Sequence, residues 1–104
     1  MNFLIIEYHK ENEKDPFLTR SISVIDEEMS LKMLFLTFNE DIIKNLTGDS
    51  HSTGEFISKV DEKCKIINNG KIIGSETLFN ELVYIEKDTD IGTVKLTTIQ
   101  VSLK

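Results

Sequence analysis

The sequence predicts an α+β domain, in which a mainly antiparallel sheet of four to five strands carries one clear amphipathic helix over about residues 54–68. Three observations predict it. Both ends of the chain are rich in β-branched and aromatic residues, a central stretch repeats its apolar residues at helical spacing, and turn residues separate these segments. A second short helix is expected over about residues 40–47. With 104 residues and no repeat or linker, residues 1–104 are expected to form a single domain.

The first two strands are expected to form a hairpin. Residues 2–9, NFLIIEYH, are apolar on both faces at the start and are typical of a buried strand. Residues 17–25, FLTRSISVI, place Leu18, Ile22 and Val24 on one face, which fits a half-buried antiparallel strand. The charged segment between them, KENEKDP, contains the only proline and predicts the connecting turn.

The segment LKMLFLTF, residues 31–38, is the most apolar stretch of the chain. Its Phe and Thr residues favour a central strand, which we predict, although Glu, Met, Leu and Lys at 27–34 also suit a helix. Asn39 fits a helix N-cap. Glu40 and Asp41 then lie at the positive end of the helix dipole, which supports the short helix ending at Gly48.

The helix over 54–68 is predicted from five apolar residues within about a 100° arc, which are Phe56, Ile57, Val60, Cys64 and Ile67. Ser52 or Thr53 can cap its start, and the segment Asn68-Asn69-Gly70 can end it in a left-handed turn. The alternative makes Asn69-Gly70 a hairpin turn between CKII and KII. The five apolar residues at helical spacing favour the helix over the hairpin.

The residue pattern of the C-terminal part of the chain predicts a second hairpin. Residues 82–87 are strand-like, residues 88–92 form a loop, and TVKLTTIQVSLK is rich in Thr and Val. The apolar positions of this last strand shift by one near Thr97-Thr98, which predicts a bulge or bend there.

Composition excludes several classes of function. No apolar run approaches the roughly 18 to 20 residues of a membrane span, and the N-terminal residues lack the features of a signal peptide. The single cysteine, Cys64, cannot form an internal disulfide, so we expect a cytoplasmic protein. A net charge of −6 repels nucleic-acid phosphates, so no direct nucleic-acid binding is expected.

No motif indicates an enzyme, a cofactor or a metal site. His9 can share a strand face with Glu7 and Glu11, but no further histidine or cysteine is near in sequence. His51, in the segment DSHS, fits a polar loop better than a catalytic triad. Cys64 is expected to be a small buried hydrophobe. The five glycines form no phosphate-binding loop, and there is no CxxC pair.

The acidity lies mainly in the first half, where residues 1–50 carry ten acids against five bases. Complementary charge steers association, so we expect a basic protein partner. The absence of alanine and the abundance of Ile, Lys and Asn indicate an AT-rich genome of a bacterium or a phage. The candidate contact residues are the acidic groups and two aromatic anchors near them, namely Glu7, Tyr8, Glu11, Glu13, Asp15, Phe17, Asp26, Glu27, Glu28, Glu40 and Asp41.

These observations favour a small immunity protein or antitoxin, of the contact-dependent growth inhibition type, that blocks the active site of a basic toxin nuclease. Three alternatives stay open. A phage-encoded inhibitor of a host defence nuclease would use the same carboxylates to mimic nucleic acid. A structural subunit or a small ligand-binding domain would explain the size and the absence of catalytic motifs equally well.

Overall fold

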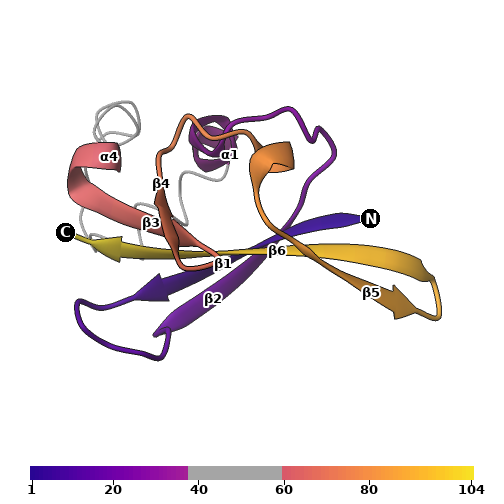
Figure 1. The fold of residues 1–104 in the computed structure, drawn as a ribbon, viewed down its shortest axis with the longest axis horizontal. Helices are drawn as coiled ribbons and strands as arrows, with labels where there is room; N and C mark the ends of the chain where they lie inside the picture. Colours follow the sequence, from indigo (N-terminus) through magenta and orange to yellow (C-terminus); the bar gives the residue numbers. More distant parts are fainter. Residues whose placement is uncertain (38–59) are drawn as a thin grey trace.

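The computed structural model describes residues 1–37 and 60–104, and the expected helix over 40–47 lies outside these residues. The described part is an α+β structure in which a mixed sheet is covered on one face by short helices and loops (Figure 1). The helical elements are α1 (Leu31–Thr37), α4 (Val60–Lys63) and the 3-10 helix η1 (Phe79–Glu81). The strands are β1 (Asn2–His9), β2 (Leu18–Ser23), β3 (Cys64–Asn68), β4 (Lys71–Ile73), β5 (Ile85–Thr89) and β6 (Gly92–Leu103).

The sheet has six strands, against the four to five expected. Its order is β2-β1-β6-β3-β4, and β5 also pairs with β6. Four of the five strand pairings are antiparallel, and the two expected hairpins, β1–β2 and β5–β6, are both present. The fifth pairing, between β1 and β6, is parallel. It brings the N-terminal and C-terminal strands together at the centre of the sheet (Figure 1).

The core lies on the covered face of the sheet. One row of register partners crosses five strands: Leu18, Tyr8, Val101, Ile66 and Ile73. Since side chains alternate between the faces of a strand, this row and its neighbours point toward the same layer. That layer, here called the cover layer, consists of residues 26–37, 60–63 and 74–82. It contributes the buried side chains of Leu31, Leu34, Phe35, Val60, Phe79 and Leu82.

The segment 31–38 was predicted to be a strand, and this prediction is wrong, because residues 31–37 form helix α1. Ser30 caps the helix, since its hydroxyl oxygen accepts a hydrogen bond from the backbone N–H of Met33 at 3.2 Å. Leu31, Leu34 and Phe35 follow the i, i+3, i+4 spacing and are buried against the sheet. The β propensity of Phe and Thr is outweighed by this cap and by the amphipathic spacing.

The helix predicted over 54–68 is also wrong at its C-terminal end. Residues 54–59 lie outside the described part, helix α4 covers only Val60–Lys63, and Cys64–Asn68 is strand β3. Cys64, Ile66 and Asn68 are buried while Lys65 is exposed, so the period of this segment is two. The alternative hairpin is therefore present. Asn69 and Gly70 have φ values of 52° and 79°, which a tight two-residue turn between β3 and β4 requires.

The predicted bulge near Thr97-Thr98 is absent from the pairing of β1 with β6, whose register runs without interruption from Asn2↔Lys95 to His9↔Ser102. The apolar pattern shifts for another reason. Thr97, Ile99 and Val101 are buried on the covered face, whereas Leu96 has the opposite orientation and lies beside Ile85 of β5. A buried threonine takes the place on the covered face where an aliphatic residue was expected.

The side chain of Asn68 links β3, β6 and the segment that precedes β5, at the place where β6 changes partners. β6 pairs with β5 over Gly92–Leu96 and with β3 over Gln100–Leu103, so the residues between lack a strand on this side. Asn68, only 6% exposed, donates through Nδ2 to the carbonyl oxygens of Thr98 (3.0 Å) and Val83 (3.3 Å). Its Oδ1 accepts from the Val83 N–H at 2.9 Å. The hydrogen bonds of the Asn68 side-chain amide thus replace part of the strand pairing that the middle of β6 lacks on this side.

Replacing Asn68 by alanine is expected to lower the free energy of unfolding by about 1–3 kcal/mol, because buried backbone groups would lose their partners. Urea denaturation followed by circular dichroism measures this loss. Asn80→Ala is the matched control, since Asn80 is exposed, and it is expected to change stability by less than about 0.5 kcal/mol. Equal stability of the two variants would contradict the role given to the Asn68 amide.

Candidate protein-interaction surface

The first predicted acidic group is Glu7, Glu11, Glu13 and Asp15, and all of it except Glu7, which lies in β1, is at the tip of the β1–β2 hairpin. Glu11, Glu13 and Asp15 are all exposed there. Lys10 and Lys14 alternate with them, so the tip as a whole carries a net charge of only −1. This alternation makes the tip a weak attractor for a basic partner.

The second acidic group, Asp26, Glu27 and Glu28, lies at the opposite end of the hairpin and is also exposed. Six register pairs of β1 and β2 separate the two groups. At about 3.3 Å per residue, this places them roughly 20 Å apart. The structure therefore does not bring these two predicted groups together. Glu40, Asp41 and His51 lie outside the described residues.

The two predicted aromatic anchors differ in their exposure. Tyr8 is fully buried in the core, and its inclusion among the contact residues was wrong. Strand β1 places Tyr8 on the covered face, in the row of core partners that crosses the sheet. Phe17 is 44% exposed, with its ring centroid 6.5 Å from that of Tyr8 and 6.0 Å from the Lys10 ammonium. Phe17 is thus the accessible member of the pair.

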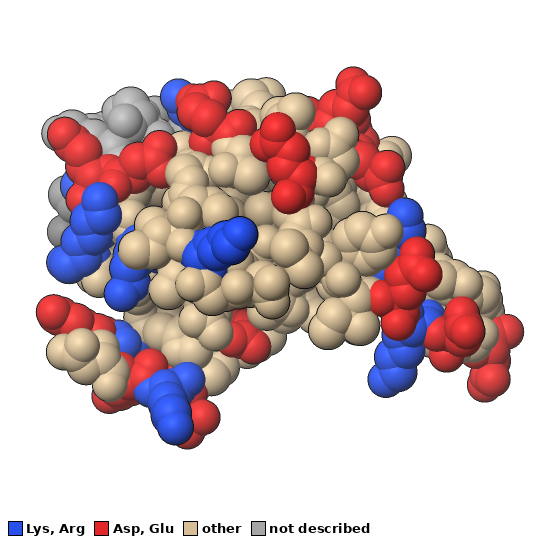
Figure 2. Space-filling view, in the orientation of Figure 1, with Lys and Arg blue, Asp and Glu red and all other residues tan. Residues whose placement is uncertain are grey.

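The carboxylates are concentrated in the cover layer. Its described residues carry seven acids against two lysines, a net charge of −5, and all seven acids are exposed. The remaining described residues carry seven acids against eight bases. Figure 2 shows the carboxylates along the side of the molecule where Figure 1 places α4, α1 and η1. The cover layer is therefore the acidic surface of the described structure.

Sequence reasoning missed four of these acids: Asp61, Glu62, Glu76 and Glu81. They come from the second half of the chain, which looked nearly neutral because its lysines balance its acids in sequence. Folding places these lysines and these acids on different parts of the molecule. Lys65, Lys71, Lys87 and Lys95 belong to the strands, whereas these acids belong to the segments that cover them. No local motif marks the four acids.

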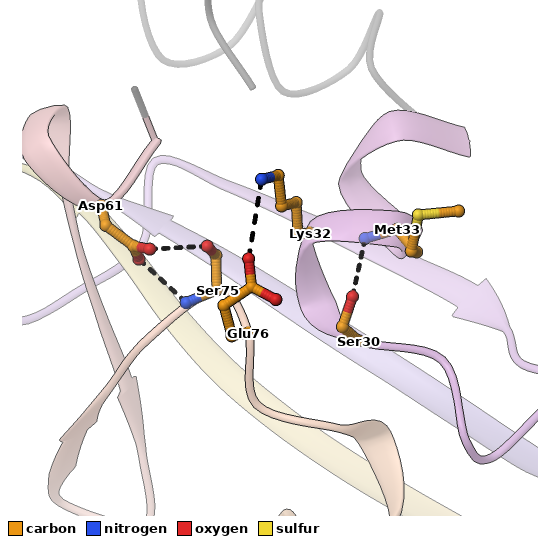
Figure 3. A network of polar contacts seen from close by, with 6 residues as sticks. All are labelled: Ser30, Lys32, Met33, Asp61, Ser75 and Glu76. Carbon is orange, nitrogen blue, oxygen red and sulfur yellow. Dashed lines mark hydrogen bonds and ion pairs between the residues drawn. The ribbon is translucent and has the colours of Figure 1, made fainter. Parts of the chain in front are cut away.

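Several of the acids also hold the cover layer together. The Asp61 carboxylate accepts from the Ser75 N–H at 2.8 Å and from its hydroxyl at 2.6 Å, which ties α4 to the loop after β4 (Figure 3). In the same view, Lys32 of α1 pairs with Glu76 at 3.6 Å. The Glu81 carboxylate accepts from the Leu78 N–H at 3.0 Å. The first two contacts link separate segments of the cover layer, and the third is local to η1.

The remaining carboxylates of the cover layer have different environments. The Glu27 carboxylate accepts from the Asn2 amide at 2.6 Å, and that of Asp26 accepts from the Glu28 N–H at 2.9 Å. The side chains of Glu28 and Glu62 are exposed and make no hydrogen bond or ion pair with another described residue. These two carboxylates can pair with a partner without breaking a contact between residues of the described ranges.

His9 and Glu7 form a pair on the uncovered face of the sheet. Their side chains are 3.3 Å apart, and His9 is 8% exposed. They do not converge with Glu11, which lies in the exposed turn. No group of three or more potential metal ligands occurs among residues 1–37 and 60–104. A cavity of about 330 Å³ borders His9, and the lysines among its lining residues are Lys10, Lys14 and Lys65.

Cys64 is buried in β3, which confirms its expected role as a small core residue although its element was predicted wrongly. Burial raises the pKa of its thiol to about 11. Lys63 and Lys104 oppose the rise, and Asp61 adds to it. At neutral pH the group is therefore a protonated thiol, which is a poor nucleophile and a poor metal ligand.

Comparison of the chain with protein-family models, with curated proteins and with solved structures finds no match. Within the described ranges, 1–37 and 60–104, no helix has both the length and the apolar character needed to cross a membrane.

The raised pKa of Cys64 predicts a pH dependence of stability. In the unfolded chain this thiol ionises near pH 9, whereas in the folded protein it holds its proton up to about pH 11. The folded state binds more protons in this window, so its stability falls as the pH rises from 9 to 11. Urea unfolding at several pH values is expected to show a shallower fall for Cys64→Ala than for the native protein. Parallel curves would contradict the assignment.

Proposed function

We propose that this protein is an inhibitory binding partner that neutralises a basic toxin, in the manner of a cytoplasmic immunity protein of the contact-dependent growth inhibition type. The observation that carries the proposal is the charge of the cover layer, with seven exposed carboxylates against two lysines. In this proposal the protein acts by binding alone and catalyses no reaction. A partner with a basic surface is the type that such a layer selects.

A nuclease fits this surface because it must itself bind phosphates. Its substrate cleft carries Lys and Arg, which an acidic layer can cover and so keep from nucleic acid. Electrostatic attraction would accelerate the encounter, and this acceleration would weaken as salt is added. To bind the toxin before the toxin reaches its substrate, the protein must be in the same compartment as the toxin. We propose that this compartment is the cytoplasm.

We place the proposed contact set in the cover layer rather than at the hairpin tip. The hairpin tip carries two lysines among its three acids, whereas Asp26, Glu27 and Glu28 join four further acids in the cover layer. Among these, Asp61, Glu76 and Glu81 hold internal contacts. Glu28 and Glu62 are the best positions for testing the proposal, because changing them leaves those contacts in place.

The test is affinity capture from the source organism, followed by binding measurements on the captured protein. We expect a basic nuclease whose activity the native protein inhibits. Reversing charge in the double variant Glu28→Lys, Glu62→Lys is expected to weaken binding at least about tenfold and to reduce its salt dependence. The matched control is Glu11→Lys with Glu13→Lys at the hairpin tip, which is expected to weaken binding much less.

Two results would overturn the proposal. Capture of a set of acidic housekeeping subunits, with no basic enzyme inhibited, would exclude toxin neutralisation. Equal affinity and equal salt dependence for the cover-layer and hairpin-tip variants would exclude the cover layer as the contact surface.

A further inference from the structure

The cavity of about 330 Å³ on the uncovered face of the sheet carries an excess of positive charge. The described residues that line it include three lysines, Lys10, Lys14 and Lys65, and one acid, Glu13. The chain as a whole has 18 acids against 12 lysines and arginines. A quarter of these bases therefore border one cavity, where the charge balance is the reverse of that of the whole chain.

The floor of the cavity consists of three neighbouring strands. His9 of β1 pairs with Ser102 of β6, and Ser102 pairs with Lys65 of β3. Since the preceding residues Tyr8 and Val101 are buried in the core, His9 and Ser102 lie on the opposite face, in one row with Lys65. Neighbouring strands are about 4.8 Å apart, so one small ligand can contact more than one residue of this row.

The turn between β1 and β2 supplies a wall of the cavity. Residues of the segment 10–14 border the same cavity as Lys65 of β3, although β6 lies between β1 and β3 in the sheet. The turn therefore leans over the uncovered face. The exposure of His9 agrees with this arrangement, because the side chain is only 8% exposed on a face that the cover layer leaves open. The cavity thus combines a rigid floor with a buried polar side chain.

Two of the three lysines are available to a ligand. Neither Lys14 nor Lys65 forms a hydrogen bond or an ion pair with another described residue, and both are exposed. The ammonium of Lys10 lies 6.0 Å from the centroid of the Phe17 ring, so this lysine already has an internal contact. Lys14 and Lys65 are therefore the cations that a ligand can pair with at no cost to contacts between described residues.

The carboxylates near the cavity leave the positive excess in place. Glu13 is exposed in the turn. Glu7 is not among the lining residues, and its carboxylate lies 3.3 Å from Nε2 of His9. Even when both carboxylates are counted, two acids face three lysines.

A phosphate group matches this arrangement better than a carboxylate does. A phosphate monoester carries a charge of about −1.5 to −2 at neutral pH, so it can pair with two ammonium groups at once. The Ser102 hydroxyl and the Gln100 amide, which also line the cavity, can donate hydrogen bonds to further oxygens. The volume is at the lower end of the roughly 300–1,000 Å³ of small-molecule sites, which suits a small ligand.

We propose that this cavity binds a small molecule that carries a phosphate group, with the phosphate held between Lys14 and Lys65. The inference goes beyond the proposed function and does not depend on it, because the cavity lies on the face of the sheet opposite the acidic cover layer. The lysines supply the attraction, and the floor residues Gln100 and Ser102 orient the ligand.

The probe is ribose 5-phosphate, titrated into the full chain labelled with ¹⁵N, and unphosphorylated ribose is the comparison ligand. We expect saturable shifts of the amide resonances of residues 9–14, 65–67 and 100–102, with a Kd below about 1 mM. Ribose is expected to cause no saturable shift. Added sodium chloride is expected to weaken the binding of ribose 5-phosphate, because salt screens the attraction between the phosphate and the ammonium groups.

The double variant Lys14→Gln, Lys65→Gln is expected to bind ribose 5-phosphate at least about tenfold more weakly, since each lysine supplies a charge-assisted contact. The matched control is Lys71→Gln with Lys87→Gln, which removes the same charge from exposed lysines outside the cavity. The control is expected to change the affinity by less than about twofold, because distant exposed charges are screened. The ¹⁵N spectrum of each variant reports whether it is folded.

Three results would overturn the phosphate site. The first is the absence of saturable shifts with ribose 5-phosphate. The second is equal binding of ribose and ribose 5-phosphate, which would show that the phosphate is not recognised. The third is an equal loss of affinity in the cavity variant and in the control variant, which would show that only the net charge of the protein matters.

Discussion

Strand β6 is the element on which the rest of the sheet depends. Over its twelve residues it pairs with β1 on one side and with both β5 and β3 on the other. Two strands on one side leave a gap, and the Asn68 amide closes part of it with three hydrogen bonds. This single polar side chain thereby sets the position of Val83 and the orientation of the segment that leads into β5.

The sequence was sufficient to predict what depends on local pattern. The first hairpin, the second hairpin and the burial of Cys64 follow from alternation, turn residues and residue size. The segment Cys64–Asn68 shows where local pattern failed, because Cys64 fits both a helical and an alternating template. The turn chemistry of Asn69-Gly70 was the better guide, since a pair of positive φ values suits this hairpin and is costly elsewhere.

Other features could not be predicted because they depend on distant partners. Nothing near Asn2 or Lys95 in sequence indicates that these residues pair in parallel. The acidic surface is a similar case. Its carboxylates come from three separate segments, and the contact between Asp61 and Ser75 that joins two of them spans 14 positions. Tyr8 was assigned to the surface because aromatic residues are common in interfaces, but its strand register places it in the core.

The parallel pairing of β1 with β6 also has a consequence for how the chain folds. The partners in this pair are 93 positions apart, from Asn2 to Lys95. On the ribosome, β1 and β2 can form their hairpin early, but the other edge of β1 has no strand partner until residues 95–102 have been made. Closing such a long loop precedes most of the favourable contacts, so topology of this kind folds slowly. In the interval, the backbone N–H and C=O groups on that edge of β1 remain accessible to chaperones and to other nascent chains.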